Sequence, residues 1–134
     1  MQDGGPLNAD APKTLSLSDL EGTPPSGTLL CQLNDLPNHG GKEIIFTEGQ
    51  LRTSIFVQKT DDTVAVFLNH CPHAGTPLNM LGDRFLDMRG QNILCRTHGA
   101  TFNRTTGKCI SGPCKGRYLK SIAHRVINGA IISL

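Results

Sequence analysis

The sequence predicts an all-β domain, an antiparallel β sandwich, from three observations. Short apolar runs recur from residue 28 onward, pairs of turn-forming residues separate them, and no segment carries a helical apolar repeat long enough for a substantial helix. Regularly spaced short strands with such turns are typical of sandwiches and small barrels. At 134 residues the chain has the size of one domain.

The apolar runs predict where the strands lie. Asn128-Gly129 and Glu48-Gly49 separate neighbouring runs, and Asn-Gly is the strongest short hairpin signal because both residues tolerate a positive φ. Both alternate sets of side chains at 63–69 are apolar, which predicts a strand in the centre of its sheet. We expect strands at 28–33, 43–46, 53–59, 63–69, 91–95, 100–103, 107–110, 118–124 and 130–134.

The first part of the chain differs in composition from the rest. Residues 1–27 are rich in Gly, Pro, Ser, Asp and Thr and hold few large apolar side chains. Such a segment buries too little apolar surface to offset the entropy lost on ordering. We therefore expect a flexible or loosely attached tail at 1–27 and a folded domain at 28–134.

Charge and hydropathy exclude several classes of function. The net charge is +2, Lys and Arg are scattered, and the chain has no Trp, so a nucleic-acid partner is not expected. No apolar run approaches the roughly 18–20 residues of a membrane-spanning helix, and the N-terminus lacks the features of a secretory signal. These observations predict a cytoplasmic protein with no membrane partner.

Cysteine usage points to metal binding or catalysis. The odd number of cysteines, and the reducing compartment expected for the chain, argue against a disulfide framework. Cys31 falls in an apolar strand, where it is expected to pack as a small apolar side chain. The five cysteines are Cys31, Cys71, Cys95, Cys109 and Cys114.

Two Cys–His pairs each follow an apolar run and open a loop that contains glycine. Cys71 and His73 form C-x-H, and Cys95 and His98 form C-x-x-H. Two such loops at one end of a sandwich would bring together two thiolates and two imidazoles, which suit Zn, Fe or Cu. One interpretation is a zinc site, for which this spacing is atypical. The other is an iron–sulfur cluster in which two cysteines bind one iron and two histidines the other.

The stretches "CPHAGTPL" and "CRTHGATFNRTTGKCISGP" resemble the two cluster-binding boxes of the Rieske proteins, and the likeness extends over roughly residues 29–134. The resemblance implies one [2Fe-2S] cluster per chain. It assigns Cys71 and Cys95 to the inner iron and His73 and His98 to the outer iron.

The chain is similar to a stand-alone, ferredoxin-type member of that family, with a smaller cluster-binding subdomain at about 70–116. The resemblance implies an electron-transfer protein rather than an enzyme. It would pass electrons from a flavin-dependent reductase to a terminal oxygenase or another oxidoreductase, through transient contacts. Two alternatives stay open: an accessory subunit of a larger oxidoreductase and a structural zinc-binding interaction module.

The chain departs from the respiratory and photosynthetic members in two ways. Thr76 and Thr97 stand where those members carry disulfide-linked cysteines. Ala100 and Phe102 stand where they carry a serine and a tyrosine whose hydroxyls donate hydrogen bonds to cluster sulfurs. Without those donors, the expected potential lies toward the bottom of the Rieske range of about −150 to +300 mV.

Three residues near the boxes have more than one interpretation. Cys109 is expected to pack in the core. Cys114, in the loop at 111–116 that resembles the family's cover over the cluster, would either tune the site or join Cys109 in a disulfide on oxidation. Arg96 would contact an acidic redox partner or stand as a surface charge.

Overall fold

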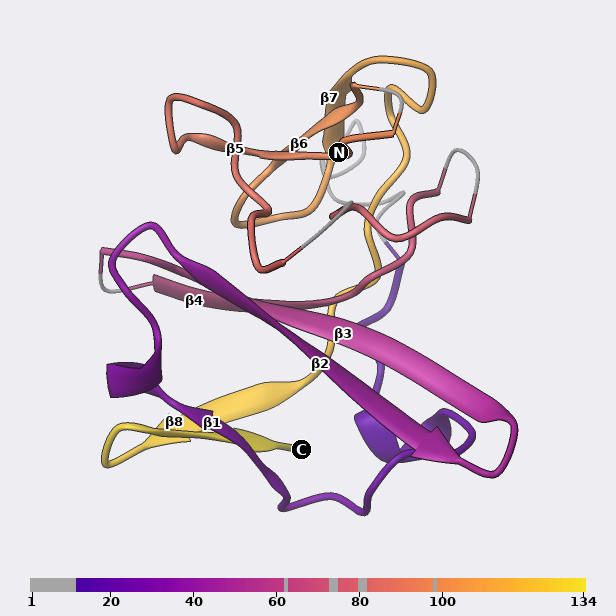
Figure 1. Cartoon of the computed structure of the whole chain (residues 1–134), viewed down its shortest axis with the longest axis vertical. Helices are drawn as coiled ribbons and strands as arrows, with labels where there is room; N and C mark the ends of the chain where they lie inside the picture. The colour runs from indigo at the N-terminus through magenta and orange to yellow at the C-terminus, as the bar shows by residue number, and fades with distance from the viewer. Residues whose placement is uncertain (1–11, 62, 73–74, 80–81, 98) are drawn as a thin grey trace, which may run out of the picture.

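A computed structural model describes residues 12–61, 63–72, 75–79, 82–97 and 99–134, and the prediction of an all-β domain is confirmed in it (Figure 1). Within those ranges no helix has the length and apolarity that a bilayer crossing requires. The strands are β1 (Leu29–Gln32), β2 (Gly41–Glu48), β3 (Leu51–Thr60), β4 (Thr63–Leu68), β5 (Asn92–Leu94), β6 (Thr101–Asn103), β7 (Cys109–Ser111), β8 (His124–Ile127) and β9 (Ala130–Ser133), and the 3₁₀ helices are η1 (Leu17–Asp19) and η2 (Leu33–Asp35).

The strands form three antiparallel sheets that lie in layers. Their orders are β1-β9-β8, β2-β3-β4 and β5-β6-β7, and Figure 1 shows β2-β3-β4 between the other two. Phe67 of the middle sheet packs with Phe102 of β6 on one side. Val57 packs with Ile131 of β9 on the other side. The middle sheet therefore separates two hydrophobic cores.

The prediction that 63–69 forms a central strand is wrong. β4 lies at the edge of its sheet, beside β3, with one isolated bridge from Phe67 to Ser121 on its other side. Its side chains are apolar on both faces because the whole sheet is a middle layer. Ala65 and Phe67 enter one core, and Val66 enters the other.

Turn chemistry is where the sequence describes the fold best. Asn128 and Gly129 have φ of 50° and 81° and join β8 to β9, as the Asn-Gly signal predicts.

Residues 118–124, expected to be one strand, instead make isolated bridges to three different partners before β8 begins at His124. This segment crosses from the small sheet to the outer one, so no single neighbour accompanies it.

The segment before β1 packs more closely than its composition suggests. Leu17 is fully buried in the core shared with β1 and β9. The Leu15 amide donates to the Ser121 carbonyl at 2.9 Å, and the Gly27 amide donates to the Ser133 carbonyl at 2.8 Å. Leu17, the partly buried Leu15 and Leu20 and a few backbone hydrogen bonds attach this part of the expected tail to the domain. Residues 1–11 lie outside the described residues.

Candidate metal centre

The first box forms a closed turn with Cys71 at its base. The Cys71 amide donates to the Thr76 carbonyl at 2.8 Å, and the Gly75 amide donates back to the Cys71 carbonyl at 2.8 Å. Gly75 has a φ of 72°, which glycine adopts without steric strain. A Cβ at this position would lie 3.1 Å from Nε2 of His70, an exposed residue, so the turn also fits closely against that ring.

The second box repeats this geometry at the same offsets. The Cys95 amide donates to the Ala100 carbonyl at 2.8 Å, and the Gly99 amide donates to the Cys95 carbonyl at 2.8 Å. Gly99 has a φ of 76°. The two boxes differ in sequence, C-x-H against C-x-x-H, yet each cysteine begins an equivalent turn. The chain therefore presents two matched loops, one after β4 and one after β5.

Direct hydrogen bonds join the second loop to its surroundings. The Arg96 amide donates to the Leu78 carbonyl at 2.9 Å, which links the second loop to the segment after the first. The Arg96 guanidinium donates from Nη2 to the Leu86 carbonyl at 2.8 Å and from Nε to the Arg84 carbonyl at 3.3 Å. Arg96 thus makes hydrogen bonds within the fold, which the sequence did not predict. Its contact with an acidic redox partner stays a prediction.

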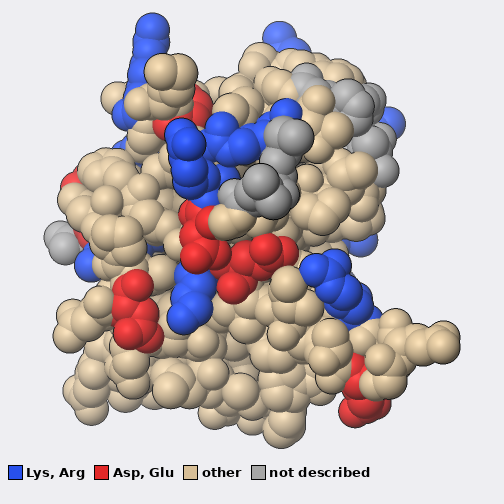
Figure 2. Space-filling view, in the orientation of Figure 1, with Lys and Arg blue, Asp and Glu red and all other residues tan. Residues whose placement is uncertain are grey.

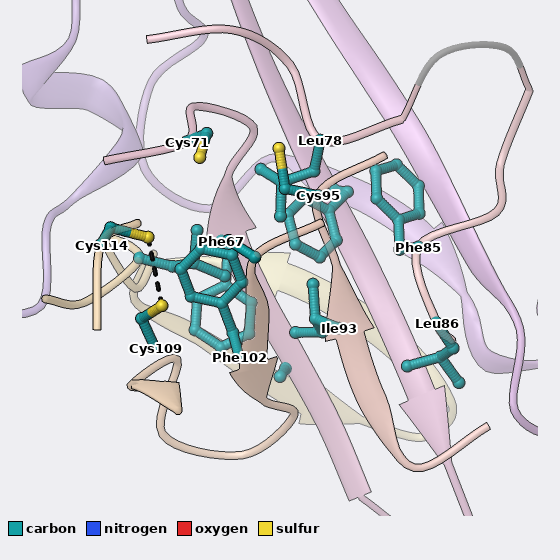
Figure 3. Packing of buried hydrophobic residues seen from close by; sticks show 14 residues of the cluster. Phe67, Cys71, Leu78, Phe85, Leu86, Ile93, Cys95, Phe102, Cys109 and Cys114 are labelled. Atoms are coloured by element: carbon teal, nitrogen blue, oxygen red, sulfur yellow. Dashed lines mark hydrogen bonds between the residues drawn. The ribbon is translucent and has the colours of Figure 1, made fainter. Parts of the chain in front are cut away.

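Both cysteine side chains are completely buried in the core beneath the small sheet. Figure 3 shows Cys71 and Cys95 along the upper edge of this hydrophobic core, with Leu78 next to Cys95 and the rings of Phe67 and Phe102 below. Apolar walls exclude water from the space where a metal–thiolate bond would form, and the surrounding hydrophobic shell controls the dielectric and the redox behaviour of such a centre.

The structure describes two of the four predicted ligands, Cys71 and Cys95, whereas His73 and His98 lie outside the described residues. The ligand set therefore stays a prediction. In the ranges that are described, no group of three or more His, Cys, Asp or Glu side chains could hold a metal ion.

One buried hydroxyl fits a bound sulfur-rich group. Oγ1 of Thr76, in the first loop, is buried and has no hydrogen-bond partner among the described residues. A buried polar group without a partner is unfavourable by about 1–3 kcal/mol. An anionic cluster held between the loops would offer sulfur acceptors on this side, so the residues present fit a [2Fe-2S] group.

Cys109 of β7 and Cys114 of the third loop, which follows β7 at 112–116, add two further sulfurs to the site. Sγ of Cys114 donates to Sγ of Cys109 at 3.1 Å, and both side chains are buried. The Cys114 thiol also interacts with the side chain of Cys71. Burial, followed by the hydrogen bond with Cys109, raises the pKa of Cys114 to about 12. The loop packs tightly on the second one, because a Cβ on Gly112 would lie 2.7 Å from Cα of Ala100.

A polar network that sequence reasoning missed fastens the first loop to the middle sheet. The Glu43 carboxylate of β2 accepts hydrogen bonds from Ser54 Oγ at 2.7 Å, Asn79 Nδ2 at 2.8 Å and Asn69 Nδ2 at 3.1 Å. Partial burial on its own raises the pKa of Glu43, but these hydrogen bonds together outweigh it and the net shift is downward. Asn69 Oδ1 in turn accepts from the Leu78 amide at 2.8 Å.

A hollow of about 730 Å³ lies between the start of β2 and residues 83–90, and charges of both signs line it. In Figure 2, acidic side chains gather near the middle of the face with Lys and Arg side chains next to them. Because positive and negative side chains alternate here, this surface does not build up a long-range potential of one sign, and charged partners interact with it mainly at short range. The charged residues lining the hollow include Asp35, Lys42, Asp83, Arg84, Asp87 and Arg89.

Comparison with known proteins gives a family. The family model described as the Rieske [2Fe-2S] domain matches residues 27–124. No curated protein matches the chain significantly.

Solved structures give the same fold. The ferredoxin of carbazole 1,9a-dioxygenase from Nocardioides aromaticivorans IC177 is 20% identical, with a TM-score of 0.61 over 81% of this chain and 97% of that one. The Sphingomonas yanoikuyae B1 ferredoxin is 24% identical, with a TM-score of 0.59 over 80% and 96%. A complex of reduced oxygenase and oxidized ferredoxin in carbazole 1,9a-dioxygenase includes a chain that is 21% identical, with a TM-score of 0.62 over 79% and 90%.

Proposed function

The chain belongs to the Rieske [2Fe-2S] domain family, and from this premise we propose that it is a one-electron carrier. We propose one cluster per chain, with Cys71 and Cys95 as thiolate ligands and His73 and His98 as imidazole ligands. A bound [2Fe-2S] cluster supplies a centre that gains and loses a single electron. The matched turns at Cys71 and Cys95 are the observation that carries this proposal.

The residues around the proposed centre support electron transfer because they keep water away from it and hold the two loops in place. The two cysteines are buried among apolar side chains, which keep water from the thiolates. Arg96 and the Glu43 network fix the loops from outside. We propose that residues of about 70–116 form the cluster-binding subdomain, carried on the middle sheet.

Oxygenase systems supply the proposed partners. Two of the solved structures that share the fold are ferredoxins, and a third is a complex of an oxygenase with a ferredoxin. We propose a flavin-dependent reductase upstream and a terminal oxygenase or another oxidoreductase downstream, each bound transiently. In this scheme the chain transfers electrons and catalyses no reaction of its own. A cytoplasmic location remains a prediction from the sequence.

The test is the content of the purified protein, prepared with iron and without air. We expect a reddish-brown protein with iron and acid-labile sulfide in equal amounts. After reduction with dithionite, its low-temperature electron paramagnetic resonance signal should have the low average g that histidine ligation gives. A colourless protein with one zinc per chain would instead establish the structural zinc module.

Matched variants locate the ligands. Cys71→Ser and Cys95→Ser should each lose the visible spectrum, because the hydroxyl is a poorer ligand for iron than a thiolate. Cys31→Ser is the control, since Cys31 is also buried but lies in the core on the other side of the middle sheet. Retention of a full cluster in Cys71→Ser or Cys95→Ser would contradict the assignment.

A further inference from the structure

We propose that the Cys114 thiol donates a hydrogen bond to the sulfur of Cys71 in the cluster-loaded protein and thereby raises the reduction potential of the centre. This inference rests on the proposed function, because it needs Cys71 to be a metal-bound thiolate. It assigns a tuning role to a residue of the third loop that binds no iron itself.

The geometry brings the three sulfurs together from separate parts of the chain. Cys71 follows β4, Cys109 begins β7, and Cys114 lies in the loop after it. Sγ of Cys114 lies 3.1 Å from Sγ of Cys109, and Cys114 also interacts with the side chain of Cys71, which is buried in the same core. Figure 3 shows Cys109 and Cys114 below Cys71, at the end of the hydrophobic core near Phe67.

The protons on these sulfurs decide which hydrogen bonds form. Cys109 donates from Sγ to the Ser111 carbonyl at 3.2 Å, so its proton is committed to the backbone. Cys114 has one proton and two sulfur acceptors, Cys109 and Cys71. Cys71 gives up its own proton when it binds iron, since the thiolate is the ligand. In the loaded protein Cys71 is thus an acceptor with negative charge.

Charge settles the competition between the two acceptors. A hydrogen bond to an ionised acceptor is roughly twice as strong as one between neutral groups. Cys109 donates its own proton to the Ser111 carbonyl, and the sulfur of a thiol is a weak acceptor. Both Cys114 and Cys71 are buried, and the low dielectric of an apolar interior strengthens the charged interaction further. The Cys114 proton therefore points to Cys71 when the cluster is present.

A donor at this sulfur changes the balance between oxidation states. Reduction adds negative charge to the cluster and its thiolates, so the hydrogen bond is stronger in the reduced state and raises the potential. Ala100 and Phe102 offer no hydroxyl on the second loop. Cys114 supplies a donor from the third loop instead, which moves the potential up from the bottom of the Rieske range expected from those two residues.

The experiment is a redox titration of cluster-loaded Cys114→Ala beside the parent protein. At a fixed solution potential we expect the ratio of reduced to oxidised protein to be about tenfold lower in Cys114→Ala than in the parent. This corresponds to a reduction potential lower by about 59 mV for a one-electron couple. Cys114→Ser should recover part of this loss because its hydroxyl also donates. Cys31→Ala is the control, because Cys31 is buried on the other side of the middle sheet and its loss should leave the potential unchanged. Cys109→Ala removes the competing acceptor and should not lower the potential.

A second measurement needs no variant to hold its cluster. The infrared S–H stretching band of Cys114, identified by its absence in Cys114→Ala apoprotein, should lie at lower frequency in the loaded parent protein than in the apoprotein. An unshifted band overturns the inference even if Cys114→Ala fails to bind a cluster. So does a Cys109–Cys114 disulfide in the loaded protein, found by mass spectrometry after thiol alkylation, because it leaves no donor.

The outcomes separate this inference from the proposed function. A parent protein that holds neither iron nor sulfide ends the proposed function, and the inference with it. A normal cluster with the same potential in Cys114→Ala, Cys114→Ser and the parent ends the inference alone. A potential that falls equally in Cys109→Ala and Cys114→Ala also contradicts it, since the effect would then belong to packing.

Discussion

Asn79 donates a hydrogen bond from Nδ2 to Oε1 of Glu43 at 2.8 Å, across 36 positions of the chain. Glu43 belongs to the middle sheet, and Asn79 lies just beyond the first cysteine loop. Asn69, the residue after β4, donates to Oε2 of Glu43 and to Oδ1 of Asn79. The three side chains fasten the proposed cluster loop to a rigid sheet, so the position of Cys71 depends on a carboxylate outside both boxes.

Replacement of this carboxylate should loosen the loop. Glu43→Gln keeps the size of the side chain but loses one oxygen acceptor and the charge, so Asn79, Asn69 or Ser54 loses a partner. We expect a loss of about 1–3 kcal/mol in the free energy of unfolding, measured by urea denaturation. Glu48→Gln, at the exposed end of the same strand, is the control. Equal effects of the two substitutions would remove Glu43 from its anchoring role.

The same carboxylate predicts a dependence of stability on acid. Because the pKa of Glu43 is lowered on folding, its ionised form stabilises the fold. That contribution is complete above the pKa of an unfolded glutamate, about 4.3, and is lost as the pH falls through the lower folded pKa. Glu43→Gln should therefore lose less stability than the parent between pH 5 and acid, roughly, in unfolding curves across that range.

Some of that acid dependence should survive in Glu43→Gln. The pKa of Asp87 is also lowered, because backbone hydrogen bonds to its carboxylate outweigh its slight burial. Its contribution has the same sign, present above the unfolded pKa and lost below the folded one. A Glu43→Gln protein with the full acid dependence of the parent would show that Glu43 contributes nothing.

Two glycines of the third loop offer a matched pair. Gly112 and Gly116 have φ of 101° and 92°, so alanine strains the backbone at both. A Cβ on Gly112 would also lie 2.7 Å from Cα of Ala100, whereas nothing lies within 4 Å of one on Gly116. We expect the new methyl group of Gly112→Ala to push on the second loop, so that this variant loses its cluster several-fold faster on heating than Gly116→Ala. The decay of the visible absorbance measures the rate of loss. Equal rates in the two variants would contradict this contact.

Sequence reasoning succeeded where the signal is local. The runs before Cys71 and Cys95 placed both cysteines after strands, and Asn128-Gly129 placed a hairpin, because turn chemistry depends on neighbouring residues. The all-β class followed from the same turns. The four-ligand set still depends on the family resemblance, since His73 and His98 lie outside the described residues.

Interactions between distant parts of the chain could not be predicted in the same way. Glu43 looks like any strand glutamate until the pairing of β2 with β3 places it beside Ser54. Leu17 looks like part of a polar tail until the outer sheet covers it. In each case the deciding partner is set by tertiary packing, which overrides local composition.

The layered arrangement also predicts which part of the fold opens first. Phe85 stacks on Phe56 of β3 with ring centroids 4.2 Å apart and planes 6° from parallel, so it joins the small-sheet side to the middle sheet. Ile131 of β9 is fully buried in the other core. Phe85→Ala and Ile131→Ala remove comparable core contacts on opposite faces, about 3–5 and 2–5 kcal/mol respectively.

Amide hydrogen exchange can separate the two faces. We expect Phe85→Ala to speed exchange first in β5, β6 and β7, and Ile131→Ala to speed it first in β1, β8 and β9, since local opening follows the contacts that were lost. This pattern would support a cluster-binding subdomain that opens separately from the outer layer. If both variants speed exchange equally in all three sheets, the chain unfolds as one cooperative unit, and the boundaries at about 70–116 have no energetic meaning.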